Sequence, residues 1–401
     1  MRDGWDVKPL KEVCLIKPPK SEARKGQNAD FLVSFAPMET LGIDQKYLIT
    51  NQTRTMSDVI GSYTYFTNGD VLLAKITPCF ENGKLGIASD LINNIGFGSS
   101  EYIVFRANEQ LDAEWLYYYL SRQSFRNEGA SRMAGAVGHK RITKDFIEDY
   151  PIPIPPFPEQ RRLVAILDEA FEGIATAKVN AEKNLQNARE LFESHMNTVF
   201  SQRSEGWVEG TLGQITKFID YRGKTPNKTE YGVRLITAKN VKMGYLQPIP
   251  MEFVAPESYE SWMTRGIPKF GDVLFTTEAP LANIAQLDID EKVIFAQRII
   301  IMQPDHKKLC NTFLKYLLMS FPVQQRIHAM GTGATVKGIK ARLLKQIEIS
   351  FPSLSEQHHI VTILDGLREE TQRLESLYHQ KLAALDELKQ SLLHQAFNGD
   401  L

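Results

Sequence analysis

Two stretches of the chain share an ordered series of residues and decide its fold. Residues 151–168 read PIPIPPFPEQRRLVAILD, and residues 349–365 read ISFPSLSEQHHIVTILD. Their shared letters keep an offset of 197 positions, and the Gly-Asp-Val-Leu sequence of residues 69–72 returns at residues 271–274 with an offset of 202. An ordered series at almost constant spacing indicates an internal repeat. Each half is therefore expected to be a globular region followed by one long helix.

The expected helices follow the two connectors. The prolines between residues 151 and 158 cannot continue a helix or a central strand, so they predict an extended connector into a first helical turn. Apolar residues then recur mostly three or four positions apart, which is the pattern of a coiled-coil seam. The first seam contains Leu163, Leu167, Ala170, Ile174, Ala177, Ala181, Leu185, Ala188, Phe192 and Val199. The second helix begins at the capping candidate Ser355, and its seam contains Ile360, Leu364, Leu367, Leu374, Tyr378, Leu385, Leu388 and Leu392.

The two seams are expected to pack on each other. Each stretch has about 40 residues without proline, which corresponds to a rod of roughly 60 Å. Such a rod cannot bury its seam alone, and the simplest partner for one seam is the other, packed antiparallel. The alternative is that each helix lies on the surface of its own domain.

The predicted fold class is α+β, with two repeated domains separated by a pair of long antiparallel coiled-coil helices. Buried strands are expected at residues 71–74, 102–105 and 293–302, and short helices at residues 115–120 and 313–319. This mixture does not follow the regular alternation of a doubly wound nucleotide fold. The expected domains are residues 1–157 and 205–352, and the expected spacer helices are residues 158–204 and 353–401.

Composition excludes several classes of protein. The 401 residues are 43% hydrophobic and 24% charged, as in ordinary globular proteins. Cys14, Cys79 and Cys310 are far apart and form no CxxC pair, which favours reduced thiols and no structural metal. The sequence shows neither a signal-peptide pattern nor an apolar run long enough to cross a membrane, so a cytoplasmic protein is expected. The formal net charge is −1, although residues 205–352 carry 19 basic against 14 acidic residues.

An enzymatic interpretation has weak support. Glu278, Asp290 and Lys292 have some of the pattern of a metal-dependent nuclease, but such combinations occur by chance in a charged chain. The sequence lacks a GxSxG elbow and an HExxH motif. The chain is therefore interpreted as a binding protein without catalytic residues. A metal-dependent nuclease and a coiled-coil scaffold that does not bind DNA remain the alternatives.

Polar loops are the candidate binding residues. Amides, hydroxyls and cations in such loops can contact base edges and phosphates, although ordinary surface turns have the same composition. The candidates in the first half are Lys75, Thr77, Asn82, Lys84, Lys140 and Arg141. Those in the second half are Arg222, Lys224, Thr225, Thr276, Thr277, Asn283, Lys337 and Lys340.

The whole chain resembles the DNA-specificity (S) subunit of type I restriction-modification enzymes. The motifs that carry the resemblance are the proline-rich connector into residues 159–168, its second copy at residues 356–365, the two Gly-Asp-Val-Leu strands and the closing residues 396–399. The second connector departs from the pattern because it has fewer prolines, with Ser353-Leu354-Ser355 before the helix.

The resemblance implies a function in DNA methylation and phage defence. Each domain would read one half of an interrupted, asymmetric double-stranded DNA target, and the helices would set the gap. Two modification subunits that use S-adenosylmethionine would bind around the helices, and restriction subunits that use ATP and magnesium would complete the assembly. This chain itself would bind no cofactor. The implied interface candidates are Glu159, Gln160, Arg161, Glu356 and Gln357.

Overall fold

The computed structural model of the chain describes residues 4–24, 28–136, 138–202, 205–221, 225–296, 298–333 and 336–401. The chain divides into two compact units. The first unit consists of Met1–Ala181 and Gln380–Leu401, and the second unit of Glu182–His379. Each unit contains one globular domain and a part of each long helix, α7 (Phe157–Ser201) and α13 (Leu354–Asn398).

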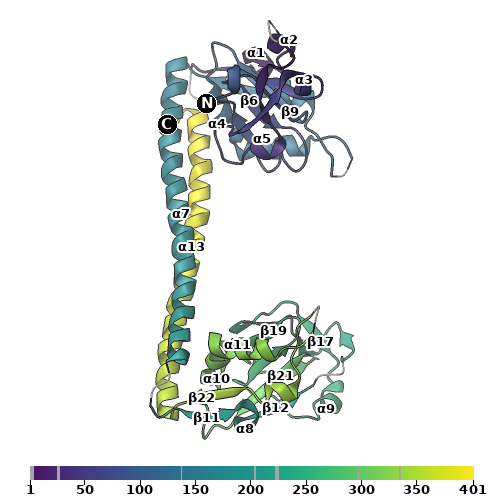
Figure 1. Ribbon diagram of the computed structural model, residues 1–401, viewed down its shortest axis with the longest axis vertical. Helices are drawn as coiled ribbons and strands as arrows, with labels where there is room; N and C mark the ends of the chain where they lie inside the picture. Colours follow the sequence, from purple (N-terminus) through teal and green to yellow (C-terminus); the bar gives the residue numbers. More distant parts are fainter. Residues whose placement is uncertain are drawn as a thin grey trace. The chain divides into compact units, whose positions relative to one another are not determined.

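Two four-stranded sheets form the body of the first unit (Figure 1). Its strands are β1 (Asp6–Pro9), β2 (Cys14–Ile16), β3 (Leu32–Ala36), β4 (Gln52–Thr55), β5 (Thr64–Phe66), β6 (Val71–Ala74), β7 (Leu85–Ile87), β8 (Gly96–Gly98), β9 (Tyr102–Ala107) and β10 (Pro151–Ile154). One sheet has the order β2-β9-β6-β7 and is antiparallel, and the other has the order β4-β3-β8-β5 with β3 and β8 parallel. Strands β1 and β10 form a separate antiparallel ribbon.

Short helices complete the first unit. They are α1 (Leu10–Val13), α2 (Ser21–Arg24), α3 (Met56–Val59), α4 (Ala113–Ser121), α5 (Gln123–Ser131) and α6 (Lys144–Glu148), with 3-10 turns η1 (Met38–Thr40) and η2 (Ile92–Asn94). The Asp112 carboxylate caps α4 by accepting from the Glu114 amide (2.8 Å). This helix confirms the one predicted at residues 115–120.

Strand β6 shows why a continuous apolar run becomes a central strand. Val71 and Leu73 pack into one hydrophobic core, which also contains Trp115 of α4, while Leu72 and Ala74 pack into another core. Successive side chains of a strand point to opposite faces, so a strand covered on both faces is apolar throughout. The predicted strand at residues 71–74 is confirmed.

The second unit repeats this architecture. Its strands are β11 (Val208–Thr211), β12 (Thr216–Asp220), β13 (Lys228–Thr229), β14 (Val233–Ile236), β15 (Val241–Lys242), β16 (Tyr245–Leu246), β17 (Glu252–Val254), β18 (Val273–Thr277), β19 (Leu281–Gln286), β20 (Val293–Phe295), β21 (Ile299–Pro304) and β22 (Glu348–Phe351). Its short helices are α8 (Leu212–Ile215), α9 (Ser258–Trp262), α10 (Asn311–Met319), α11 (Phe321–Met330) and α12 (Ala341–Leu344). The four-stranded sheets have the orders β12-β21-β18-β19 and β13-β17-β14-β20, and β11-β22 and β15-β16 form two-stranded sheets.

The prediction of one strand over residues 293–302 is wrong. Strand β20 pairs in parallel with β14, while β21 pairs with β12 and β18 in the other sheet. The chain passes from one sheet to the other between β20 and β21, and a purely apolar pattern does not reveal this change because both strands are buried. Strands β8 and β9 of the first unit are related in the same way.

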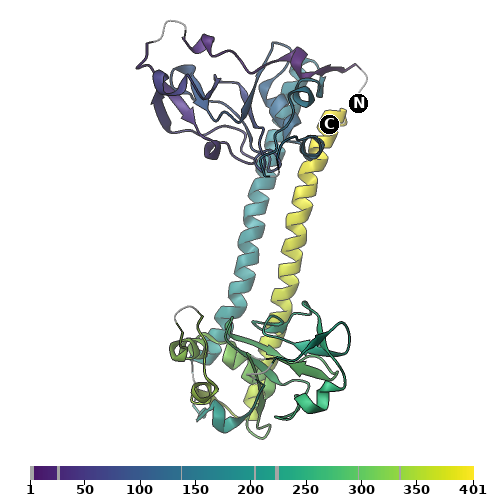
Figure 2. The same ribbon diagram turned by 90° about the vertical axis from the view of Figure 1, so that its right-hand side faces the viewer.

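Helices α7 and α13 have 45 residues each and pack together in opposite chain directions, as predicted (Figure 2). In the first unit, Lys178 of α7 pairs with Asp386 of α13, and Arg162 near the start of α7 donates to the carbonyl of Leu401 beyond the end of α13 (2.9 Å). In the second unit, Arg189 pairs with Glu375 (3.5 Å). None of the helices in the described parts of the chain is long and apolar enough to cross a membrane.

Two details of the second helix differ from prediction. It begins at Leu354, so Ser355 lies inside the helix, and it is the Ser353 hydroxyl that accepts from the Glu356 amide (3.4 Å). Leu388 does not belong to the seam, because it is 47% exposed. The last turns instead bury Phe397, whose ring centroid lies 4.1 Å from that of Trp115. The domain of the first unit, rather than the opposite helix alone, determines which face of this end is buried.

Candidate nucleic-acid interface

Two loops of the first unit are joined directly after strand β6. The Thr77 amide donates to the Lys140 carbonyl (3.0 Å), and the Ile142 amide donates to the Lys75 carbonyl (2.9 Å). The Thr77–Pro78 peptide bond, in the loop after β6, is cis. The loop after β6 and the loop before α6 therefore form one surface, although they are distant in the sequence.

The candidate side chains on this surface differ in how freely they can reach a ligand. Asn82 and Lys140 are exposed. Arg141 donates to both carboxylate oxygens of Glu101 (2.9 and 2.8 Å), which raises the pKa of the guanidinium and fixes its orientation. The other candidates donate within the unit: Thr77 to Glu81 (2.9 Å), Lys75 to the Ser100 carbonyl (2.9 Å) and Lys84 to the Met38 carbonyl (2.7 Å). Asn82 and Lys140 are therefore the most accessible.

The second unit joins the equivalent loops with one of the same backbone hydrogen bonds. The Ile339 amide donates to the Thr277 carbonyl (3.0 Å), as Ile142 does to Lys75. The described candidates that are exposed here are Thr225, Lys337 and Lys340. Arg222 and Lys224 lie outside the described residues.

Three candidates of the second unit are used within the fold. Thr276 is fully buried and accepts from the Asn283 amide (2.9 Å). Thr277 is buried and its hydroxyl donates to the Arg298 carbonyl (3.3 Å). The Asn283 side chain donates to the Val241 carbonyl (2.9 Å). Because their hydrogen-bonding groups already serve the sheet, these side chains are poorly placed to contact DNA directly.

The residues of the nuclease alternative are not brought together. Glu278 pairs with Arg298 (3.0 Å), whereas Asp290 and Lys292 line a cavity of about 430 Å³ whose lining does not include Glu278. Within the described ranges, His, Cys, Asp and Glu side chains form no group of three or more that could hold a metal ion. The geometry therefore gives this alternative no support.

Gln160, a predicted interface residue, fixes the start of α7 to its own domain. It is completely buried, accepts from the Asp112 amide (2.8 Å) and donates to the carbonyls of Gln110 and Pro155 (2.8 Å each). A partner subunit cannot reach this side chain without displacing these bonds. The repeat in the sequence marks this residue, but no local pattern indicates its structural role.

Gln357 has the same role in the second unit. It binds the Cys310 amide and the carbonyls of Lys308 and Pro352, each at 2.8 Å. The remaining interface candidates are more accessible. Glu159 forms an ion pair with Arg162 (2.7 Å). Arg161 is largely exposed, and its guanidinium lies 3.7 Å from the Asp112 carboxylate. Glu356 is half-buried in the first turn of α13.

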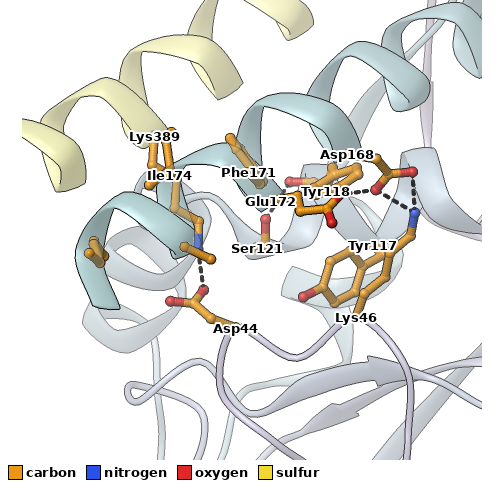
Figure 3. Close-up of a pocket in the computed structure, with 12 residues that line it drawn as sticks. Asp44, Lys46, Tyr117, Tyr118, Ser121, Asp168, Phe171, Glu172, Ile174 and Lys389 are labelled. Carbon is orange, nitrogen blue, oxygen red and sulfur yellow. Dashed lines mark hydrogen bonds and ion pairs between the residues drawn. The ribbon is translucent and has the colours of Figure 1, made fainter. Parts of the chain in front are cut away.

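A cavity of about 320 Å³ lies between the domain and the helices of the first unit (Figure 3). The Lys46 ammonium binds both carboxylate oxygens of Asp168 on α7 (2.7 and 2.8 Å), and the Tyr118 hydroxyl donates to the same carboxylate. Burial, together with this hydrogen bond, raises the pKa of Tyr118. Lys389 of α13 pairs with Asp44 across the cavity (2.7 Å). Asp168 was visible in the sequence as part of the repeated Ile-Leu-Asp, but its partners were not.

The second unit has a cavity of about 530 Å³ at the equivalent place. Tyr316 donates to Asp365 (2.5 Å), as Tyr118 does to Asp168, and Arg368 donates to the Gly244 carbonyl (2.7 Å). Among the residues that line this cavity are Phe192, Met196, Met243, Tyr245, Met319 and Phe321. The Tyr–Asp hydrogen bond is thus shared by the two units, whereas the cavity walls differ.

The two repeated domains, each with joined loops and each fixed to the same helix pair, define a binding protein with two equivalent recognition surfaces. A family model described as type I restriction modification DNA specificity domain matches residues 2–186 and again residues 204–383. The chain belongs to this family. It is a DNA specificity subunit of a type I restriction-modification system and is itself non-catalytic.

Known relatives extend over most of the chain. The type I restriction enzyme EcoAI specificity subunit of Escherichia coli is 25% identical over 501 residues, which cover 98% of this chain and 81% of the relative. The HsdS subunit from Thermoanaerobacter tengcongensis has the same fold, with a TM-score of 0.69, 21% identity and coverage of 100% of this chain and 98% of that chain. A second similar chain comes from a structure on complex assembly and conformational transition of the type I R-M system. It has a TM-score of 0.81 and 20% identity, and the match covers 100% of this chain and 99% of that chain.

Proposed function

We propose that each unit reads one half of an interrupted, asymmetric target in double-stranded DNA. The observation that carries this proposal is that the same two loops are joined in both units, by an equivalent backbone hydrogen bond from Ile142 or Ile339, while the side chains on them differ. The expected readers are Asn82, Lys140 and Arg141 with Lys75, Thr77 and Lys84 behind them, and in the other unit Thr225, Lys337 and Lys340, together with Arg222 and Lys224. Residues 1–157 and 205–352 would be the reading domains, and residues 158–204 and 353–401 the spacer helices.

Two modification subunits would bind this chain, one on each unit. Exposed apolar side chains on the helices support such a docking surface in both units. They are Val179 and Leu388 in the first unit, and Leu191, Ile363 and Leu377 in the second. Scattered apolar side chains are common on surfaces, but apolar positions on the outer flanks of both helices favour a helical partner. S-adenosylmethionine would be held by the modification subunits, and ATP and magnesium by restriction subunits, in the cytoplasm.

Charged substitutions on the helix flanks test this docking. Val179→Lys combined with Leu388→Lys is expected to remove one modification subunit, and Leu191→Lys combined with Leu377→Lys the other, because a lysine at the centre of an apolar contact must be desolvated. Native mass spectrometry of the complex would show two bound subunits reduced to one. Asn180→Lys, at a neighbouring exposed position, is the control. Retention of both subunits in the two double variants would contradict the proposed surface.

The helices are proposed to set the gap between the half-sites. One heptad inserted after Ala181 and another after His379 would fall at the boundaries between the two units and keep the coiled-coil phase. Each helix would become longer by about 10 Å. The gap in the methylated target should then grow by about three base pairs, at 3.4 Å per base pair, with both half-sites unchanged. Mapping of methylated sites would measure this, and an unchanged gap would contradict a spacer role.

A further inference from the structure

A cavity of about 670 Å³ in the first unit is lined by four basic side chains. Lys17, Lys75 and the pair Arg141 and Lys144 come from three separate segments of the chain and converge on this one cavity. Its remaining lining includes one acidic side chain, Glu148. Lys75 and Arg141 are candidates from the sequence, whereas Lys17 and Lys144 are not.

The backbone at Lys17 is unusual. Its φ is 61°, in the left-handed region that residues other than Gly, Asn and Asp rarely adopt. The Lys17 amide donates to the Val104 carbonyl (2.8 Å), so the conformation is fixed by strand β9. In the described part of the chain, no carboxylate forms an ion pair with the Lys17 ammonium. A strained position that holds an unpaired cation at a cavity is a feature associated with ligand binding.

The acidic groups only partly neutralise this cavity. Glu101 binds Arg141 in a bidentate pair and lies 3.7 Å from the Lys75 ammonium, and Glu148 lies 3.3 Å from Lys144. Two carboxylates therefore face four cations.

The surplus positive charge affects Lys75 directly. Burial lowers the pKa of this lysine, and the nearby cations of Lys17 and Arg141 lower it further, although Glu101 acts in the opposite direction. An anion bound between the three cations would relieve this repulsion.

The second unit has no cation at the positions aligned with these four. The register of the repeated strands and loops aligns Lys75 with Thr277, because both amides donate to the carbonyl of the residue directly before the equivalent strand, Glu101 before β9 or Arg298 before β21. The same alignment places Ile219, Gly338 and Ala341 where the first unit has Lys17, Arg141 and Lys144, and Lys345 where it has Glu148. The basic wall is therefore a property of the first unit and not of the shared fold.

We propose that this cavity binds a phosphate group of double-stranded DNA and anchors the half-site that the first unit reads. The inference rests on the proposed function and adds that the two units hold the DNA backbone unequally. Ile76, next to Lys75, bridges to Arg141, so the cavity adjoins the joined loops. Ammonium and guanidinium groups are the usual partners of phosphate oxygens. A phosphate in this place would set the position of one strand beside Lys140 and Asn82.

Substitution of Lys17 and Lys144 in the full chain tests the anchor. Binding to a duplex of random sequence would be measured by fluorescence anisotropy over a series of salt concentrations. Lys17→Gly removes the ammonium and also removes the backbone strain, so this variant should be at least as stable as the parent. Its affinity should fall, and the slope of log affinity against log salt should decrease by about 0.9, which is the effect of one lost phosphate contact. Lys144→Gln should act in the same direction, whereas Lys345→Gln in the second unit is the matched control.

The outcomes separate this inference from the proposed function. Absence of DNA binding by the parent chain would overturn both. DNA binding with the same salt slope in Lys17→Gly, Lys144→Gln and the parent would overturn only the anchor, as would an equal decrease in Lys345→Gln. Inorganic phosphate provides the second probe: if phosphate raises the Tm of the parent but the salt slopes are unchanged, the cavity is a site for a free anion and not for DNA.

Discussion

The first and second units hold the start of their long helix with the same three hydrogen bonds, yet they present different side chains to solvent. Gln160 and Gln357 each bind one amide and two carbonyls at 2.8 Å, and Tyr118 and Tyr316 each donate to an aspartate on that helix. The four basic positions of the first unit's cavity, by contrast, hold uncharged residues in the second, and Lys345 stands where the first has Glu148. The repeat has kept the bonds that fix domain to helix and has changed the groups that can contact DNA.

The ion pairs between α7 and α13 have opposite polarity in the two units. Lys178 and Glu375 are 197 positions apart, as are Arg189 and Asp386, so the two ion pairs between α7 and α13 occupy equivalent positions with opposite polarity. An attractive pair is therefore present at both places, although neither residue type is retained. Interhelical attraction matters at this position more than the identity of either side chain.

The largest effect is expected at the two glutamines. Gln160→Leu or Gln357→Leu leaves one buried amide and two carbonyls without their partner, which should reduce the free energy of unfolding by about 3 kcal/mol. Hydrogen exchange should show the loss in the unit that carries the substitution and not in the other. Gln186→Leu, at an exposed position of α7, is the control. A large loss from one of the two substitutions and none from the other would contradict the equivalence of the two units.

A buried lysine in the second unit should produce a smaller effect that depends on pH. Lys315 occupies the position of Tyr117, and burial, with the Arg368 cation, lowers its pKa to about 8 despite Asp365 and Cys310. At pH 7 the ammonium is charged in both states, so Lys315→Met should stabilise the protein by about 1–3 kcal/mol. As the pH rises from about 8 towards the unfolded value of 10.5, the native lysine loses its proton first, and the parent should gain stability.

Denaturant unfolding between pH 7 and pH 10.5 measures this dependence. The Lys315→Met variant should lack the rise that the parent shows, and Lys307→Met, which changes an exposed lysine, should retain it. Parallel curves for Lys315→Met and the parent would mean that the burial of Lys315 has no energetic consequence.

The smallest effect is expected at the exchanged ion pairs. Lys178→Glu should cost about 0.5–1 kcal/mol at low salt, because it places two acidic groups together, and Asp386→Lys should restore the loss in the double variant. Arg189→Glu with Glu375→Arg forms the matched cycle in the second unit. Equal coupling energies in the two cycles, both weakened by salt, would support the equivalence, and a coupling in only one unit would contradict it.

Much of the fold follows from local sequence patterns. The repeat, the helix pair, the α+β class and the strand at residues 71–74 all come from periodicity, proline positions and apolar runs. The division of residues 293–302 between two sheets does not, because β20 and β21 have the same buried, apolar character and only long-range pairing distinguishes them.

The candidate site was less predictable, since its properties depend on distant backbone groups. Gln160 is fixed by carbonyl and amide groups of residues 110 and 112, which no pattern near Gln160 identifies. Thr276 has the composition of a binding residue but is fully buried. Lys17 belongs to the basic cavity through its position beside Lys75, and its left-handed backbone has no signal in a lysine followed by prolines.

The most direct test of the account exchanges one reading domain for the other. Residues 206–352 would be replaced by a second copy of residues 4–155, and methylated sites would be mapped in cells that supply the modification subunit. Because Gln160 and Gln357 hold equivalent backbone atoms, the copied domain should attach to α13 as the original does. We expect an interrupted target in which both halves carry the sequence read by the first unit. A target that keeps its original two different halves would contradict the claim that each unit reads one half.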